Sequence, residues 1–359
     1  MPRSFQAPVG LDTRMPTLDR ITGLIPLDLL VRAMPRDVTS VFYHTFATGP
    51  LPHVSPLYGI KTPEDFERDL IYLKSHFNVV GHDDIVAHRA GMGELPNRAA
   101  AVSFDDGFME CFTVARPLLQ RHNVPATFFV CNSFIDNKAL MYRNRVALCV
   151  SRIEQAAATQ ATRWLADLHK RCSAPAGSVA EARKWLLSLS FVDSARIDQA
   201  CEALEISIPG FLRDRQPYMT QAQIKQLHDD GFTIGGHTSD HPELHRLDDW
   251  QQVKDQVSSS CELVREITGR ARVPFAFPFN GLDLPRSKLR ALRNELGSID
   301  LMYDTNNLMR DRDFILNRIA CDTPQGATTS RSNLSALIRR AHILEPLRTF
   351  KRGTRHRDT

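Results

Sequence analysis

Two adjacent carboxylates, Asp105 and Asp106, have the most chemically suggestive placement in this chain of 359 residues. They follow the apolar run Ala100–Phe104, which predicts a short buried strand. Gly107 then allows an immediate turn, because glycine has no Cβ to clash at positive φ. Successive side chains on an extended chain point to opposite sides, so the two carboxylates are expected to perform different tasks. A functional site is one interpretation, and a surface turn in which an aspartate caps the following helix is the other.

Two histidines, His237 and His241, stand in a similar setting. The apolar run Phe232–Ile234 predicts another short strand, and the turn that follows it carries both imidazoles. Two imidazole nitrogens and one carboxylate oxygen make a three-ligand metal site that leaves a position open for water or substrate. A His-x-x-x-His pair by itself more often arises by chance, so its weight comes from the strand and the turn that precede it.

Three motifs together resemble those of a known family, the NodB-like polysaccharide deacetylases. Residues 103–107 read Ser-Phe-Asp-Asp-Gly, against Thr-Phe-Asp-Asp-Gly in the family, and residues 237–241 read His-Thr-Ser-Asp-His, against His-Ser/Thr-x-x-His. Residues 275–281 read Phe-Ala-Phe-Pro-Phe-Asn-Gly, which is similar to the Phe-Ala-Tyr-Pro-Tyr-Gly of one branch of these carbohydrate esterases. Each motif is weak alone, but the three occur in the family's order, each after a predicted strand.

The resemblance implies a role for each matching residue. Asp105 would be the catalytic base, and Asp106, His237 and His241 would bind a divalent metal. The motif around Pro278 would line the substrate groove, and the backbone N–H of Phe279 would donate a hydrogen bond to the oxyanion. Two nitrogens and one oxygen suit zinc best, and cobalt, nickel or iron also fit this donor set.

Two features of the family pattern are missing. Many members carry an arginine shortly before the motif proline that orients the catalytic aspartate, but Phe275 and Ala276 occupy those places and Arg272 is displaced. The residue that orients Asp105 is therefore left unassigned.

The family's late histidine, in a Leu-x-His motif, also has no counterpart. The late histidines are His342 and His356, and neither lies in that motif. His342 falls in a predicted helix, where a surface or core role is expected. His44 ends the predicted first strand, Val38–Tyr43, and is the other histidine that could reach a substrate site.

The order of the predicted elements favours an α/β fold with parallel strands. Every chemically suggestive residue stands at the carboxyl end of a strand, which is the layout of a (β/α) barrel, and the resemblance implies the irregular seven-stranded version. Residues 134–217 contain helical runs without a confident strand and predict a helical insertion. We therefore expect an N-terminal arm (1–36), a barrel with this insertion (37–345) and a basic tail (346–359).

Composition and charge narrow the class of protein. Charged residues make up 24% and hydrophobic residues 42% of the chain, as in soluble globular proteins, and a net charge of +4 gives no argument for nucleic-acid binding. The seven cysteines show no paired spacing, which argues against a disulfide framework, and no apolar run near the start resembles a signal peptide. We expect a cytoplasmic protein. Residues 24–31 are too short to span a bilayer, although a peripheral membrane contact there is an alternative.

Three functions remain open at this point. The first is a metal-dependent hydrolase that removes N-acetyl groups from a sugar in a polysaccharide or glycan precursor, such as a glycolipid. The second is an amidase that cleaves a C–N bond in a substrate that is neither a peptide nor a sugar. The third is a catalytically silent, glycan-binding barrel. The sequence predicts neither the sugar nor the oligomeric state.

Overall fold

The computed structural model describes residues 25–33, 37–175, 177–322 and 334–353. Its centre is a closed barrel of seven parallel strands, which confirms the predicted fold class. The pairing of β1 with β3 closes the barrel, and the two-residue β2 (Asn78–Val79) adds to the free edge of β3 beside the start of β4. The barrel strands are β1 (Val38–Tyr43), β3 (Ala99–Phe104), β4 (Ala126–Val130), β5 (Thr233–Gly236), β6 (Val273–Ala276), β7 (Ile299–Asp304) and β8 (Ile315–Ala320).

The strands are buried on both faces, as expected for a parallel sheet covered by helices. Alternate residues of β3 belong to different apolar clusters. Ala99 and Ala101 pack with the residues inside the barrel, whereas Ala100 and Val102 pack with those between the barrel and its helices. Asp105 continues the sequence spacing of the inner residues, so the strand itself directs this side chain toward the barrel mouth.

Strand register brings the candidate residues to one end of the barrel. β1 and β3 pair from Val38 with Ala99 to Tyr43 with Phe104, so His44 and Asp105 follow at the same level. The backbone N–H of Asp105 donates to the carbonyl of Tyr43 at 3.0 Å. β4 and β5 pair in the same way, and the N–H of His237 donates to the carbonyl of Val130 at 3.0 Å.

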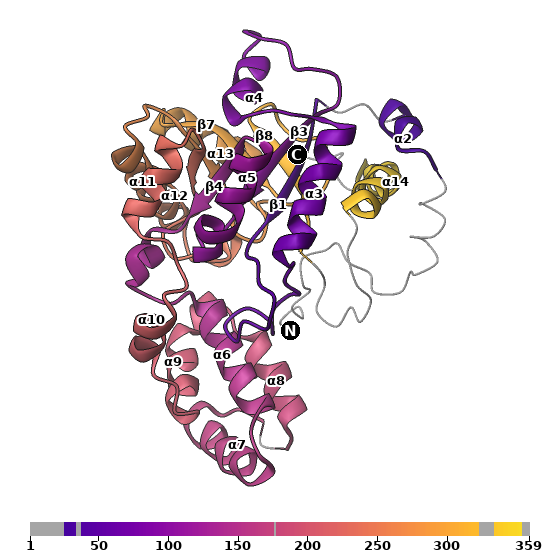
Figure 1. Ribbon diagram of the computed structural model, residues 1–359. Coiled ribbons are helices and arrows are strands. Elements are labelled where there is room, and N and C mark those ends of the chain that lie inside the picture. Colours follow the sequence, from indigo (N-terminus) through magenta and orange to yellow (C-terminus); the bar gives the residue numbers. More distant parts are fainter. Residues whose placement is uncertain (1–24, 34–36, 176, 323–333, 354–359) are drawn as a thin grey trace.

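Helices surround the barrel (Figure 1). Thr62 caps the first of them, as its sequence predicts, because its side chain accepts from the N–H of Asp65 at 3.1 Å. The last helix crosses the expected boundary after residue 345 and contacts α2 (Leu27–Ala33). The covering helices are α3 (Pro63–His76), α4 (His82–Arg89), α5 (Arg116–His122), α11 (Gln221–Asp229), α12 (Trp250–Thr268), α13 (Arg286–Leu296) and α14 (Leu334–Gly353).

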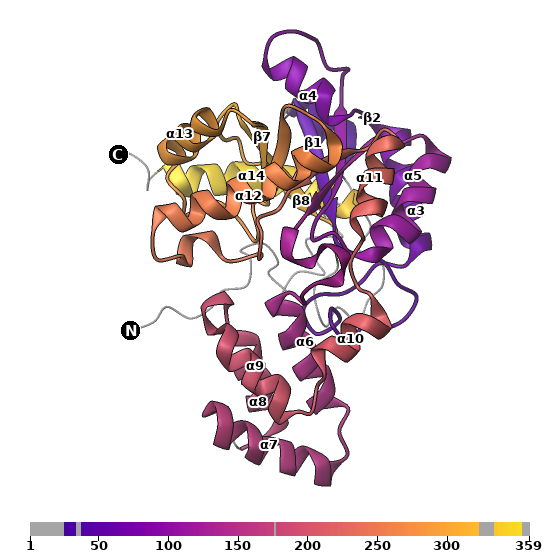
Figure 2. The ribbon, with the colours of Figure 1, turned by 90° about the vertical axis from the view of Figure 1, so that its left-hand side faces the viewer.

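A helical insertion lies between β4 and β5 and consists of α6 (Tyr142–Glu154), α7 (Ala158–Cys172), α8 (Val179–Ser188), α9 (Ser194–Ala203) and α10 (Ile208–Arg215). Figures 1 and 2 show it projecting from the barrel as a separate lobe. It has its own apolar cluster, which includes the buried side chain of Trp164. Leu148 of α6 and Phe211 of α10 instead pack with the core cluster around the barrel, so these two helices attach the helical insertion to it.

Other sequence expectations concern cysteines and membranes. All seven cysteines are buried and free of disulfides. Within the described ranges, no helix has both the length and the apolar character needed to cross a bilayer. The first 24 residues and the last six lie outside the described residues, so the expected arm and tail stay predictions in those parts.

Candidate active site

Three predicted metal ligands, Asp106, His237 and His241, meet at the carboxyl ends of β3 and β5. One ligand atom from each lies within 4.8 Å of the others, and all three side chains are buried. Asp106 Oδ1 is 3.4 Å from His237 Nε2 and 3.2 Å from His241 Nε2. The two strand-end motifs therefore form one site although they are far apart in the sequence.

Left-handed backbone conformations aim these side chains. Asp106 has φ of 71° and Gly107 has φ of 73°, so the chain turns sharply as soon as β3 ends. Thr238 and His241 also have positive φ, at 66° and 57°, and Thr238 Oγ1 accepts from the N–H of His241 at 3.0 Å. Such conformations cost free energy in residues with a Cβ and persist where the surroundings fix them, often at functional sites.

The two imidazoles are held differently. His237 Nδ1 lies 2.9 Å from the carbonyl of Ala276, so it carries the proton that it donates, and Nε2 is left as an acceptor facing Asp106. His241 Nδ1 is buried and has no hydrogen-bond partner among the described residues. Its ring instead lies 5.0 Å from that of Phe279.

The donor set fits a divalent metal ion. Asp106 Oδ1 is buried without a hydrogen-bond partner in the described part of the chain, which is unusual for a buried carboxylate oxygen. Burial alone would raise the pKa of Asp106, but the charge of the His241 imidazole holds that pKa well below its usual value. The carboxylate is therefore ionised, as a metal ligand must be.

Asp105 pairs with an arginine that the sequence analysis missed. Arg318, on β8, donates to both carboxylate oxygens of Asp105 at 2.7 and 2.9 Å and to Ser103 Oγ at 3.1 Å. Both members of the pair are almost completely buried. A two-point contact of this kind fixes the plane of the carboxylate. Arg318 is thus the residue that orients Asp105, which could not be assigned from the sequence.

Aromatic rings enclose the Arg318 guanidinium inside the barrel. Its central carbon lies 4.5 Å from the ring centroid of Phe42, 5.1 Å from that of Phe129 and 5.7 Å from that of Tyr303. The electron-rich ring faces attract the cation where water cannot. The sequence signal that could have revealed Arg318 is a charged residue within the mostly apolar predicted strand Phe314–Ile319.

His44 also reaches the site, together with a second residue that the sequence analysis missed. Its Nδ1 pairs with Asp322, just beyond the end of β8, and its ring stacks obliquely on Tyr58 at 4.9 Å. Burial lowers the pKa of His44, but the negative charge of Asp322, together with those of Asp106 and Asp105, has the larger effect. The net result is a pKa raised to about 9. The imidazole is therefore protonated at neutral pH.

The third motif forms a turn fixed by hydrogen bonds. Phe279 has φ of 58°, and its carbonyl accepts from the hydroxyl of Thr305. The N–H of Gly281 donates to Asp304 Oδ1 at 3.0 Å, and Arg286 donates to the carbonyl of Gly281 at 2.5 Å. These contacts hold the predicted oxyanion donor, Phe279, beside His241, after the buried Pro278.

Other histidines and arginines considered from the sequence lie elsewhere. His342 is buried on α14, which packs outside the barrel, and Arg272 is exposed. His356 lies outside the described residues. The expectation that His342 is not a site residue agrees with this placement.

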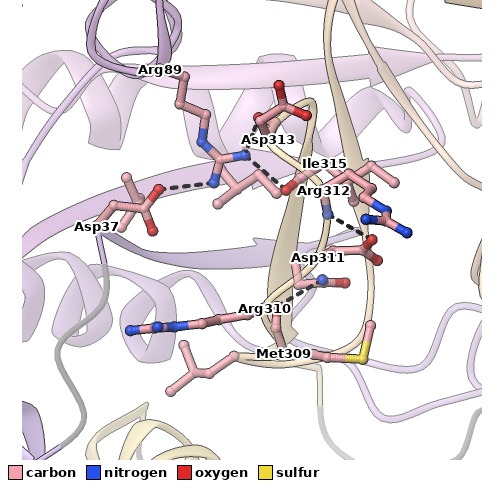
Figure 3. Close-up of a pocket in the computed structure, with 12 residues that line it drawn as sticks. Asp37, Arg89, Met309, Arg310, Asp311, Arg312, Asp313 and Ile315 are labelled. Carbon is pink, nitrogen blue, oxygen red and sulfur yellow. Dashed lines mark hydrogen bonds and ion pairs between the residues drawn. The ribbon is translucent and has the colours of Figure 1, made fainter. Parts of the chain in front are cut away.

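A separate pocket of about 420 Å³ lies near the opposite end of the barrel, where β1 and β8 begin (Figure 3). Arg89 crosses it, donating to the carbonyls of Asp313 and Ile315 at 2.7 and 2.8 Å and to Asp37 at 2.9 Å. None of the candidate site residues lines this pocket. The candidate site at the carboxyl ends of the strands is therefore distinct from this pocket.

The sequence profile of the family described as polysaccharide deacetylase matches residues 92–169 and 190–297, which together are more than half of the chain. These ranges include the Asp-Asp and the two-histidine motifs. They exclude His44, Arg318 and Asp322, which the fold adds to the site. None of the curated proteins compared with the chain matches it.

Several solved structures share the fold. The deacetylase PplD from Streptococcus pyogenes, solved with acetate, has a TM-score of 0.52 at 14% identity, over 85% of this chain and 99% of that one. IcaB from Ammonifex degensii has a TM-score of 0.51 at 14% identity, over 84% and 97%. A de-N-acetylase from Aggregatibacter actinomycetemcomitans has a TM-score of 0.51 at 14% identity, over 84% and 99%. At this identity the likeness establishes the fold.

Proposed function

The chain belongs to the polysaccharide deacetylase family, and from this premise we propose that it is a metal-dependent hydrolase that removes N-acetyl groups from a sugar. The substrate would be a polysaccharide or a glycan precursor. One observation carries the proposal: a buried carboxylate and two imidazoles converge beside a second carboxylate that an arginine holds in place. That arrangement provides separate groups for metal binding and for proton transfer.

Asp106, His237 and His241 would hold the metal, with zinc as the best fit to two nitrogens and one oxygen. When bound, a divalent ion lowers the pKa of a water from about 15.7 toward about 7 and polarises a carbonyl group. His237 is prepared for this task because its Nδ1 is engaged with Ala276. The remaining steps fall to groups of the protein.

Asp105 would accept a proton from the attacking water as general base. Its two oxygens are fixed by Arg318, so the carboxylate cannot rotate away from the site. The backbone N–H of Phe279 would donate to the oxygen of the acetyl group as negative charge develops there. One such donor contributes about 3 to 4 kcal/mol to catalysis in a well-studied hydrolase.

His44 would give the leaving amine its proton. Asp322 holds Nδ1 of the imidazole, and the raised pKa, about 9, keeps the ring protonated at neutral pH. An acid that stays charged until it is needed suits the departure of an amine, which is a poor leaving group without a proton. The proposal thus assigns to His44 the role of general acid, which neither of the late histidines could be given from the sequence.

The first test is acetate release from a panel of N-acetylhexosamine glycans and glycolipids by zinc-loaded protein. Asp105→Asn should abolish turnover because the amide cannot take the proton, and metal analysis should show that zinc is retained. The matched control is Asp283→Asn, which changes an exposed carboxylate in the loop of the third motif. Undiminished turnover in Asp105→Asn would remove Asp105 from the mechanism.

The same panel separates the alternatives. Products from amide substrates without a sugar, identified by mass spectrometry, would favour an amidase. A protein that binds glycans but neither binds metal nor releases acetate would be a silent module.

A further inference from the structure

The helical insertion is joined to the metal site by one buried carboxylate. Glu243 is 4% exposed. Its Oε1 accepts from the hydroxyl of Tyr142 at 2.6 Å, and its Oε2 accepts from the backbone N–H of Phe191 at 3.2 Å. Tyr142 is the first residue of α6, and Phe191 begins the short helical turn before α9. A single side chain of the barrel therefore contacts two elements of the helical insertion.

Glu243 belongs to the turn that carries a predicted metal ligand. We call residues 237–244 the histidine turn, and its segment from His241 to Leu244 is buried throughout. A buried carboxylate that loses a hydrogen-bond donor has no water to replace it, so these contacts restrain Glu243 strongly. Since only Pro242 separates Glu243 from His241, a restraint on one is a restraint on the other.

His241 depends on such restraint more than His237 does. The ring of His237 is oriented by its hydrogen bond to Ala276, whereas Nδ1 of His241 has no hydrogen-bond partner among the described residues. The position of His241 is left to the backbone of the histidine turn and to the ring of Phe279. Phe279 itself packs against the apolar cluster of the helical insertion.

We propose that the helical insertion positions His241 through the contact of Tyr142 with Glu243, and so sets the affinity of the site for its metal ion. Tyr142 is a positioning residue here, since it touches neither the ligand atoms nor the predicted base. The inference rests on the proposed metal site and adds to it a part of the chain outside the barrel.

The test compares zinc affinity, measured in the full chain by competition with a chromogenic chelator. Tyr142→Phe removes the hydroxyl and keeps the ring, and we expect it to weaken zinc binding by about 10-fold, the lower end of what loss of a supporting contact costs a metal site. The absorption spectrum of the cobalt-loaded variant should also change, because the geometry at His241 relaxes.

The matched control lies on the same helix. Ser151 donates to the carbonyl of Pro52 at 2.8 Å, so Ser151→Ala also removes one hydrogen bond between α6 and the barrel, but away from the histidine turn. It should bind zinc as the wild type does. Thermal unfolding of the metal-free variants separates a loss of affinity from a general loss of stability.

Each outcome decides a different point. Equal zinc affinity in Tyr142→Phe and Ser151→Ala would overturn this inference and leave the proposed function intact. A loss of affinity in Tyr142→Phe alone, at a stability like that of Ser151→Ala, would support it. Wild-type protein that binds no zinc, cobalt, nickel or iron would overturn the proposed function and this inference with it.

Discussion

The barrel interior and the histidine turn hold their functional side chains in opposite ways. Inside the barrel, strand register and an ion pair fix Asp105, because Arg318 contacts both of its oxygens. In the histidine turn, His241 has a left-handed backbone and no hydrogen bond from Nδ1 to the described residues. The barrel side is thus fixed by its own strands, whereas the turn depends on neighbouring segments.

The largest effect is expected from Arg318→Met, which tests whether the buried ion pair stabilises the barrel by removing one of its two members. The carboxylate of Asp105 would stay buried without its partner, and we expect a loss of about 3 to 5 kcal/mol in the free energy of unfolding. Urea unfolding of the metal-free protein measures it.

A control at an exposed ion pair and a double variant of the buried pair keep the test decisive. Arg290→Met changes an arginine on α13 whose partner Asp313 is exposed, and should cost at most about 1 kcal/mol. The double change Arg318→Met with Asp105→Leu removes both charges and should recover much of the stability. Similar costs for Arg318→Met and Arg290→Met would show that the barrel does not depend on the pair.

A pH experiment probes the same side of the site at His44. The folded-state pKa of about 9 lies above the unfolded value near 6.5, so the pair with Asp322 stabilises the protein fully below about pH 6.5. That contribution is lost as the pH rises through about 9. Asp322→Asn should move the titration of His44, followed by NMR in metal-free protein, down toward 6.5.

The control for this experiment is Asp229→Asn, an exposed carboxylate on α11. It should leave the titration of His44 unchanged. Wild-type His44 titrating near 6.5 would contradict the assigned pair. In that case the ring would be neutral at pH 7.5 and could not serve as the proposed acid.

The smallest expected effect concerns the turn of the third motif. Thr305→Val removes the hydroxyl that donates to the carbonyl of Phe279. The loss of one hydrogen bond should cost about 1 kcal/mol, which corresponds to about a fivefold fall in kcat if the contact serves the transition state. Thr305→Ser keeps the donor and should retain turnover. If valine and serine gave equal rates, the turn would be held without this contact.

Local motifs allowed part of the site to be predicted from sequence. Asp105, Asp106 and His237 follow a short strand at once, and His241 lies in the turn that continues from it, so the pattern of a few residues is enough to place them near strand ends. His44 was identified in the same way. The alternation of strands and helices, with the long helical stretch between Phe134 and Pro217, was equally readable because periodicity is a local property.

Arg318 and Asp322 could not be found in this way. The partner of Arg318 lies 213 residues away, and the contact exists because β1 pairs with both β3 and β8 when the barrel closes. The register between strands that are far apart in the chain is not visible in the pattern of neighbouring residues in the sequence. The contact of Tyr142 with Glu243 was hidden for the same reason, since it joins the helical insertion to a turn of the barrel.

The late position of Arg318 has a consequence for the order in which the protein is made. A nascent chain that has emerged from the ribosome only as far as β7 contains both aspartates and both histidines but not the guanidinium that neutralises Asp105. Domains generally fold as units, and this barrel closes only when β8 pairs with β1. We therefore expect the working site to assemble only after translation of β8, and chains released before that point to be substrates for quality control.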